Sequence, residues 1–339
     1  MKLTHEIVSL RTKHAFTIAR GGGSEYRVVL ATITDKDGAQ GVGEANPSRY
    51  YGENPDTTPV VLDQFQSILD KADAWSLDAI ELEMNKMWRG NGSAKSAVMS
   101  ALYDLMGKRL GVPLYKMWGL DPATAPLTSF TIGVAPEAEL RAKVQEAAEY
   151  PVLKVKLGTP DDEDIIRIIR EEAPDKVLRV DANAGWTPKQ ALDMIALLAE
   201  YEVEFVEQPL APENIEGLRY VRDRSPLPII ADESCLVASD IPKLAGVVDG
   251  INIKLAKCGG PREALKMIAV ARAHDMSVMM GCMIETSVGI TAAAHLAPLL
   301  DYADLDGAAL LAADPYHGAT IHGGVFSIPS GPGLGVTKA

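Results

Sequence analysis

Cysteine and aromatic residues are scarce in this chain of 339 residues, and long apolar runs are missing. The three cysteines, Cys235, Cys258 and Cys282, cannot all pair with one another and follow no zinc-ligand spacing. No apolar run reaches the length of a membrane span, and the opening "MKLTHEIVSLRTKH" lacks the apolar segment of a signal peptide. We therefore expect a protein of the reducing cytoplasm, without structural disulfides.

Positive charge is also in short supply. The 33 basic residues are outnumbered by 46 acidic ones, giving a formal net charge of −13. This excess argues against nucleic acid or an anionic membrane as a partner. It does not exclude a small anionic substrate, because a local cationic pocket can dominate at short range. The hydrophobic fraction of 47% is enough for a large core.

The first part of the chain has an α+β pattern. The segment "EYRVVLATITDKDGAQGVGEA" contains two strand-like runs around Asp37-Gly38, which predicts a β-hairpin. Three helical patterns follow and predict helices over 57–71, 77–88 and 93–110. We assign residues 1–121 to an α+β capping domain.

The pattern changes from about Thr128, where short apolar strands alternate with helical segments. The strands are "TSFTIG", "VLKVKLG", "VLRVDAN", "VEFVEQP", "PIIADES", "INIKLAK", "SVMMGC" and "ADLDGA". Continuously apolar strands are typical of a buried parallel sheet. Eight such units predict a modified (β/α)8 TIM-type barrel over residues 122–318. Residues 319–339 carry no helix pattern, and we expect them to return to the capping domain.

A charged residue recurs near the carboxyl end of five successive strands. The five are Lys156, Asp181, Glu207, Asp232 and Lys254, and they are separated by 25, 26, 25 and 22 residues. Each spacing equals one strand plus one helix, so all five occupy the same place in their units. In a barrel that place is the mouth, where active sites are built. Loops after strands are often polar, so chance explains a charged residue at any one of these positions. Chance does not explain charged residues at the same place in five successive units.

The identities of these residues point to a metal centre flanked by two bases. Three converging carboxylates would repel one another without a cation, and all-oxygen ligation fits Mg2+, with Mn2+ as the nearest substitute. A metal on Asp181, Glu207 and Asp232 would bind a substrate carboxylate and stabilise the enediolate left when the α-proton departs. Lys156 and Lys254 would then remove and return that proton on opposite faces, which inverts the α-carbon.

The stretch "KVK" places a second lysine, Lys154, on the same face of its strand as Lys156. A lysine must be neutral to act as a base. The like charge of Lys154 would disfavour protonation of its neighbour, and Lys154 could also contact the substrate carboxylate. Lys257 is a rival to Lys254, but it comes three residues later and we expect it in the following loop.

Together, "KVK", "VDAN", "VEQP", "ADES" and "NIKLAKCGG" resemble the enolase superfamily, in its muconate-lactonizing-enzyme subgroup. The segments "GCMIETSVGITAAAH" and "DLDG" narrow the resemblance to the dipeptide epimerases, above all those acting on L-Ala-D/L-Glu. The resemblance implies a Mg2+-dependent isomerase that inverts the C-terminal residue of a dipeptide by a two-lysine 1,1-proton transfer. It also implies a role in recycling cell-wall peptides, and we expect a homo-oligomer.

The resemblance also suggests substrate-binding residues. Asp304 and Asp306 match a motif that binds the substrate's α-ammonium. Arg20, in the glycine-rich loop of residues 19–26, could pair with a side-chain carboxylate, and Glu285 could orient Lys254. We add Thr131, on the first barrel strand. Three alternatives stay open: an epimerase for hydrophobic or cationic dipeptides, an o-succinylbenzoate synthase or cycloisomerase using the same lysines and metal, and a non-enzymatic scaffold.

Overall fold

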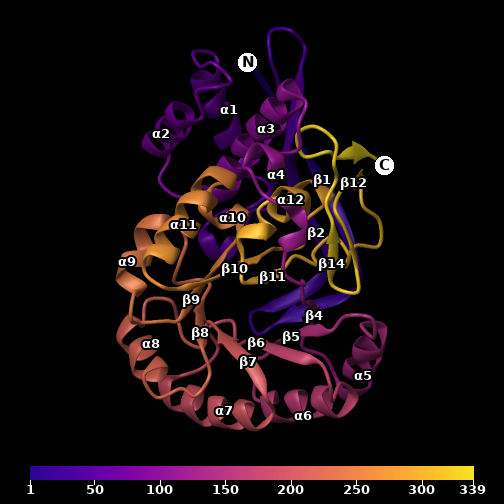
Figure 1. The fold of residues 1–339 in the computed structure, drawn as a ribbon, viewed down its shortest axis with the longest axis vertical. Helices are drawn as coiled ribbons and strands as arrows, with labels where there is room; N and C mark the ends of the chain where they lie inside the picture. The colour runs from indigo at the N-terminus through magenta and orange to yellow at the C-terminus, as the bar shows by residue number, and fades with distance from the viewer.

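The N-terminal part of the chain is a three-stranded antiparallel sheet covered by helices (Figure 1). The computed structural model describes all residues from 1 to 339. The sheet consists of β1 (Lys2–Ile18), β2 (Gly21–Thr34) and β3 (Gln40–Ala45), and the helices are α1 (Thr58–Leu69), α2 (Leu77–Met87) and α3 (Gly92–Leu110). The hairpin and the three helices expected from the sequence are confirmed. A short α4 (Leu114–Met117) leads towards the barrel.

Glycine allows β3 to lie directly against α3. A Cβ atom on Gly43 would come within 2.0 Å of the Ala97 carbonyl oxygen, and one on Gly41 within 1.9 Å of that of Ala101. The backbones touch because these positions carry no side chain. Asp104 of α3 is fully buried here, and its carboxylate accepts hydrogen bonds from the backbone of Val42 and Leu334.

The second part of the chain is an eight-stranded parallel sheet whose strands follow in sequence order from β4 to β11. A bridge between Thr128 and Ala303 brings its first and last strands together, so the sheet nearly closes on itself. The predicted modified (β/α)8 barrel is therefore confirmed. The strands are β4 (Phe130–Ile132), β5 (Val152–Lys156), β6 (Val177–Asp181), β7 (Val203–Glu207), β8 (Ile229–Ala231), β9 (Gly250–Ile253), β10 (Ser277–Gly281) and β11 (Tyr302–Asp304).

Helices line the outside of the barrel (Figure 1). They are α5 (Glu137–Glu146), α6 (Asp162–Glu172), α7 (Pro188–Glu200), α8 (Ile215–Arg222), α9 (Ile241–Leu244), α11 (Pro261–Ala273) and α12 (Ser287–Ala294), with the single-turn α10 (Leu255–Cys258) directly after β9. Their apolar faces cover the strands, and α7 begins with a capping box at Thr187. No helix combines the length and the apolar character needed to cross a bilayer.

The last residues run back along the N-terminal part of the chain, where the C-terminus lies in Figure 1. They include β12 (Tyr316–His317), β13 (Thr320–His322), β14 (Val325–Ser327) and β15 (Thr337–Lys338). The Gly333 N–H donates to the Val112 carbonyl at 2.9 Å, and the Leu114 N–H donates to the Gly333 carbonyl at 3.1 Å. These contacts support the division into residues 1–121, 122–318 and 319–339, which stays a prediction.

Candidate active site

Three carboxylates converge at the mouth of the barrel. Asp181 ends β6, Glu207 ends β7 and Asp232 directly follows β8. Asp181 and Glu207 are paired in the register of their strands, so the parallel sheet itself makes them neighbours. All three are buried, and one oxygen from each lies within 4.8 Å of those of the other two.

This cluster fits a hard divalent cation. Oε2 of Glu207 accepts no hydrogen bond, although Nζ of Lys154 lies 2.6 Å away. Burial and the charge of Asp181 raise the pKa of Glu207 to about 7, as expected for a carboxylate with too little positive charge nearby. All the candidate ligand atoms are carboxylate oxygens, and no histidine or cysteine belongs to the cluster. This ligand set favours Mg2+ over zinc.

Two lysines contact opposite ends of the carboxylate cluster. Lys156, the last residue of β5, lies with its Nζ 2.6 Å from Asp181 Oδ2. Lys254 comes directly after β9, with its Nζ 2.8 Å from Asp232 Oδ2. Burial would lower the pKa of Lys254, but the negative charges of Asp232, Glu207 and Glu233 together outweigh burial and raise it. The structure thus brings together the five residues that the sequence placed in phase.

Lys154 lies deeper, in the middle of the acidic groups. Its Nζ is 2.6 Å from Glu207, 2.8 Å from Asp304 and 3.4 Å from Asp181, and its side chain is 1% exposed. Burial would lower the pKa of Lys154, but these carboxylates raise it well above its ordinary value. The ammonium is therefore stabilised in its charged form by contacts with three carboxyl groups. It connects the candidate metal ligands to the carboxylate that ends β11.

Asp304 and Asp306 face a common partner on β4. The Thr131 hydroxyl lies 3.2 Å from Asp304 Oδ1 and 3.3 Å from Asp306 Oδ1, and the Thr131 N–H donates to Asp306 Oδ2 at 2.7 Å. The Ser129 hydroxyl also donates to Asp304 at 2.6 Å. Asp304 is paired with Lys154, whereas Asp306 makes no ion pair. Burial and the charge of Asp304 raise the pKa of Asp306 to about 7.

Arg20, in the turn between β1 and β2, reaches from the N-terminal sheet to the barrel mouth. Its guanidinium donates to the Asn183 carbonyl at 2.7 Å and to Glu233 at 2.6 Å, and it lies 4.3 Å from the centre of the Tyr50 ring. Two of its five N–H groups are used in these hydrogen bonds. Arg20 is thus anchored at the mouth, and its charge is already paired with a buried carboxylate.

Glu285 lies between β10 and α12 and makes no ion pair with Lys254. Its Oε1 instead accepts a hydrogen bond from the Met283 N–H at 2.9 Å. Glu44, reaching in from β3, caps the start of α12 by accepting from the N–H groups of Thr286 and Gly289. Burial and the charge of Glu285 raise the pKa of Glu44 to about 8.

Two further residues support the candidate metal ligands, a role that was not assigned to either of them from the sequence. Asn252 donates from Nδ2 to Glu207 Oε1 at 2.7 Å. The signal was present, because Asn252 is a polar residue two positions before Lys254 on an apolar strand and shares its face. Lys257 was expected in a loop, which is wrong. It lies in α10, is buried, and pairs with Asp232.

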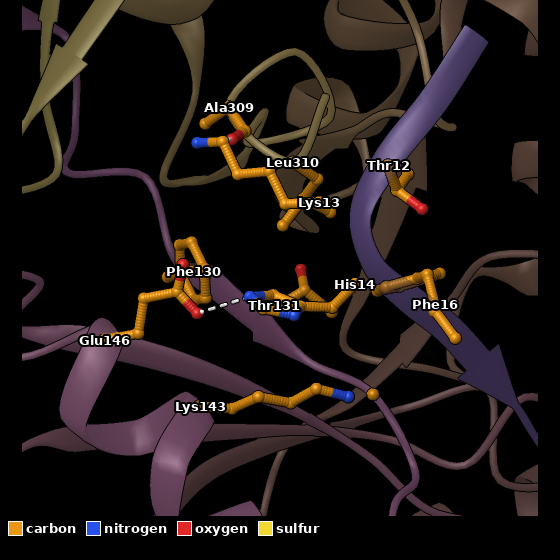
Figure 2. Close-up of a pocket in the computed structure, with 12 residues that line it drawn as sticks. Thr12, Lys13, His14, Phe16, Phe130, Thr131, Lys143, Glu146, Ala309 and Leu310 are labelled. Carbon is orange, nitrogen blue, oxygen red and sulfur yellow. Dashed lines mark hydrogen bonds and ion pairs between the residues drawn. The ribbon is translucent and has the colours of Figure 1, made fainter. Parts of the chain in front are cut away.

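A small cavity lies beside this site (Figure 2). It is lined by Thr12 to Phe16 of β1, Phe130 and Thr131 of β4, two residues of α5, and the loop after Asp306. Across it, His14 pairs with Glu146 at 3.0 Å. Only Thr131 belongs to both the cavity and the candidate site, so the cavity lies between the capping sheet and the barrel rather than over the carboxylates.

A barrel that carries three carboxylates on successive strands, flanked by lysines and covered by an α+β domain, is the architecture of the enolase superfamily. Two family models match this chain: the mandelate racemase/muconate lactonizing enzyme N-terminal domain over residues 2–119, and the enolase C-terminal domain-like model over residues 137–338. The chain belongs to the mandelate racemase/muconate lactonizing enzyme family, as its motifs predicted.

Within this family, individual proteins similar to this chain are named as epimerases. An L-Ala-D/L-Glu epimerase of Bacteroides thetaiotaomicron is 40% identical over 100% of this chain and 88% of its own. An L-Ala-D/L-amino acid epimerase of Pedosphaera parvula is 42% identical over 95% and 94%. A solved dipeptide epimerase from Enterococcus faecalis, complexed with Mg and L-Leu-L-Tyr, has a TM-score of 0.94 and 35% identity, and the match covers 99% of each chain.

Proposed function

We propose that this protein is a Mg2+-dependent dipeptide epimerase that inverts the α-carbon of the C-terminal residue. One observation carries the proposal. Lys156 and Lys254 approach the carboxylate cluster from opposite ends, each bonded to a different candidate metal ligand. A substrate carboxylate held at the cluster would place its α-carbon between two lysines. One lysine can then take the α-proton while the other supplies a proton to the opposite face.

Asp181, Glu207 and Asp232 would hold the Mg2+ ion. When bound, the ion supplies positive charge that stabilises the substrate carboxylate as the α-proton leaves. The relative complexed with Mg supports this assignment. Without the ion, Asp232 helps to raise the pKa of Lys254 and so favours its protonated form. The positive charge of the ion would lower that pKa and make it easier for Lys254 to act as a base.

The substrate's amino group would be bound at the end of β11. Asp306 is the available carboxylate, because Asp304 already pairs with Lys154. An α-ammonium at Asp306 would supply positive charge to a buried acid that has no cation of its own. This recognition favours dipeptides over the o-succinylbenzoate synthase and cycloisomerase reactions, whose substrates carry no α-ammonium.

We propose L-Ala-D/L-Glu as the preferred substrate. The Bacteroides relative bears that name, and Arg20 offers three unused N–H groups at the mouth for a side-chain carboxylate. The Enterococcus relative was solved with L-Leu-L-Tyr, so a hydrophobic second residue is the alternative on the same site. We further propose that the enzyme works in the cytoplasm, recycles cell-wall peptides and assembles as a homo-oligomer.

The proposal is tested by following α-proton exchange of L-Ala-L-Glu and L-Ala-D-Glu in heavy water, with Mg2+ and then with excess chelator. We expect exchange and epimerisation to stop with chelator and return with Mg2+. Lys156→Ala should abolish epimerisation and retain exchange, if any, from one epimer only, and Lys254→Ala from the other. Full activity after exhaustive chelation, or near-parental epimerisation by either variant, would contradict the two-lysine metal mechanism.

A further inference from the structure

Lys257 has a side chain with 0% exposure, and its ammonium is surrounded by acceptors. Nζ forms an ion pair with Asp232 Oδ1, and it donates to the Asp232 carbonyl at 2.7 Å and the Asn252 carbonyl at 3.0 Å. The Cys235 carbonyl lies 3.3 Å away. An ammonium has three N–H groups, so these four acceptors saturate it. Lys257 therefore has no donor left for a substrate.

These contacts fix the orientation of one candidate metal ligand. Lys257 holds Oδ1 of Asp232, and Lys254 lies 2.8 Å from Oδ2, so the two lysines define the plane of the carboxylate between them. The same ammonium holds the backbone of Asn252, whose side chain donates to Glu207 at 2.7 Å. One buried residue thus supports two of the three carboxylates in the cluster.

The backbone of Lys257 is itself held by the N-terminal domain. At the start of α3, a Cβ atom on Gly92 would come within 2.0 Å of the Lys257 carbonyl oxygen, so helix α3 and the single turn of α10 are in direct backbone contact. One turn later in α3, the side chain of Lys95 lies against Gly259. The residue that supports Asp232 therefore lies in a helical turn that packs directly against α3.

We propose that Lys257 is a positioning residue for the divalent cation site, acting through Asp232, and not an acid or base of the reaction. This inference rests on the metal site of the proposed function. Two effects of the ammonium oppose each other. Its charge repels a cation, whereas its hydrogen bonds hold the ligand in place. When Nζ is removed, four acceptors lose the donor that they share. We therefore expect the loss of ligand positioning to outweigh the relief of charge repulsion, so that metal binding becomes weaker. Removing a partner of this kind typically weakens metal binding by about 10- to 100-fold.

The test is isothermal titration of Mg2+ into chelator-treated, full-length protein without substrate. Lys257→Met keeps the bulk of the side chain, and Lys257→Gln keeps a hydrogen-bond donor without the charge. Lys95→Met is the matched control, because Lys95 is also a buried lysine and lies against the same turn, but its ammonium donates to the Trp88 carbonyl. We expect Mg2+ binding weakened by about 10- to 100-fold in Lys257→Met, less in Lys257→Gln, and unchanged in the control.

Each other outcome has a separate meaning. Unchanged Mg2+ affinity in a folded Lys257→Met protein would overturn the proposal, and tighter binding would show that Lys257 acts only by repulsion. If both Lys257 variants fail to fold while Lys95→Met folds, Lys257 supports the fold alone and the proposal is wrong. Failure of the unaltered protein to bind Mg2+ would instead overturn the metal site of the proposed function.

Discussion

Replacing Lys154 by Met should destabilise the protein strongly when no divalent cation is present. The side chain is 1% exposed, and its ammonium lies within 3.4 Å of three carboxylates. Removing one partner from a buried ion pair costs about 3–5 kcal/mol, because the remaining charge is left unpaired. At roughly 2.1 cal/mol/K per residue, the unfolding entropy of 339 residues is about 0.7 kcal/mol/K. The melting temperature should therefore fall by about 4–7 °C.

The measurement is thermal unfolding at neutral pH, in chelator and again with excess Mg2+. A cation bound at the neighbouring carboxylates would supply part of the lost charge, so Mg2+ should recover part of the difference. Lys156→Met is the matched control on the same strand. The Lys156 ammonium contacts only Asp181, and Asp181 still has Lys154 nearby when Lys156 is replaced. The melting temperature should therefore fall less than half as far in Lys156→Met as in Lys154→Met. A melting temperature within about 1 °C of the parent's for Lys154→Met in chelator would refute this reasoning.

Two further predictions concern other charged groups. Arg20→Met should lower the preference for Glu over Met at the second substrate position by at least about tenfold, because a charge-assisted hydrogen bond contributes about 1.5–3 kcal/mol; an unchanged ratio of kcat/KM values would remove Arg20 from substrate recognition. The pKa of Glu44 is raised from 4.5 to about 8 by burial and Glu285, so the folded protein holds a proton that the unfolded chain releases, and stability should fall as pH rises across that interval. In Glu44→Gln, the free energy of unfolding should fall less steeply as pH rises. An identical pH dependence of that free energy in parent and variant would exclude Glu44 as the cause of the fall.

The periodic pattern of the sequence was sufficient to predict the barrel and the residues at its mouth. Parallel strands that end at the same edge carry their last side chains to the same place, so equal spacing along the chain becomes proximity in space. Lys156, Asp181 and Glu207 illustrate this, since the register pairs each with the next. The three helices and the hairpin of the N-terminal domain followed from short-range patterns in the same way.

Contacts between distant segments were decided only by the tertiary structure. Lys257 looked like a loop residue because nothing in its neighbourhood shows that its ammonium meets Asp232, 25 positions away. Arg20 was recognised as a candidate, but its pairing with Glu233 joins residues 213 positions apart in two parts of the molecule.

Charge balance, in particular, has no signature in sequence. The "KVK" motif alone shows two like charges on one face, and only the folded barrel surrounds Lys154 with carboxylates from three other strands. The sequence thus determined which groups face the mouth, because strand period and unit length are local properties. The closure of the barrel and the docking of the capping domain decide which charges neutralise one another and which, like that of Asp306, are left without an ion-pair partner.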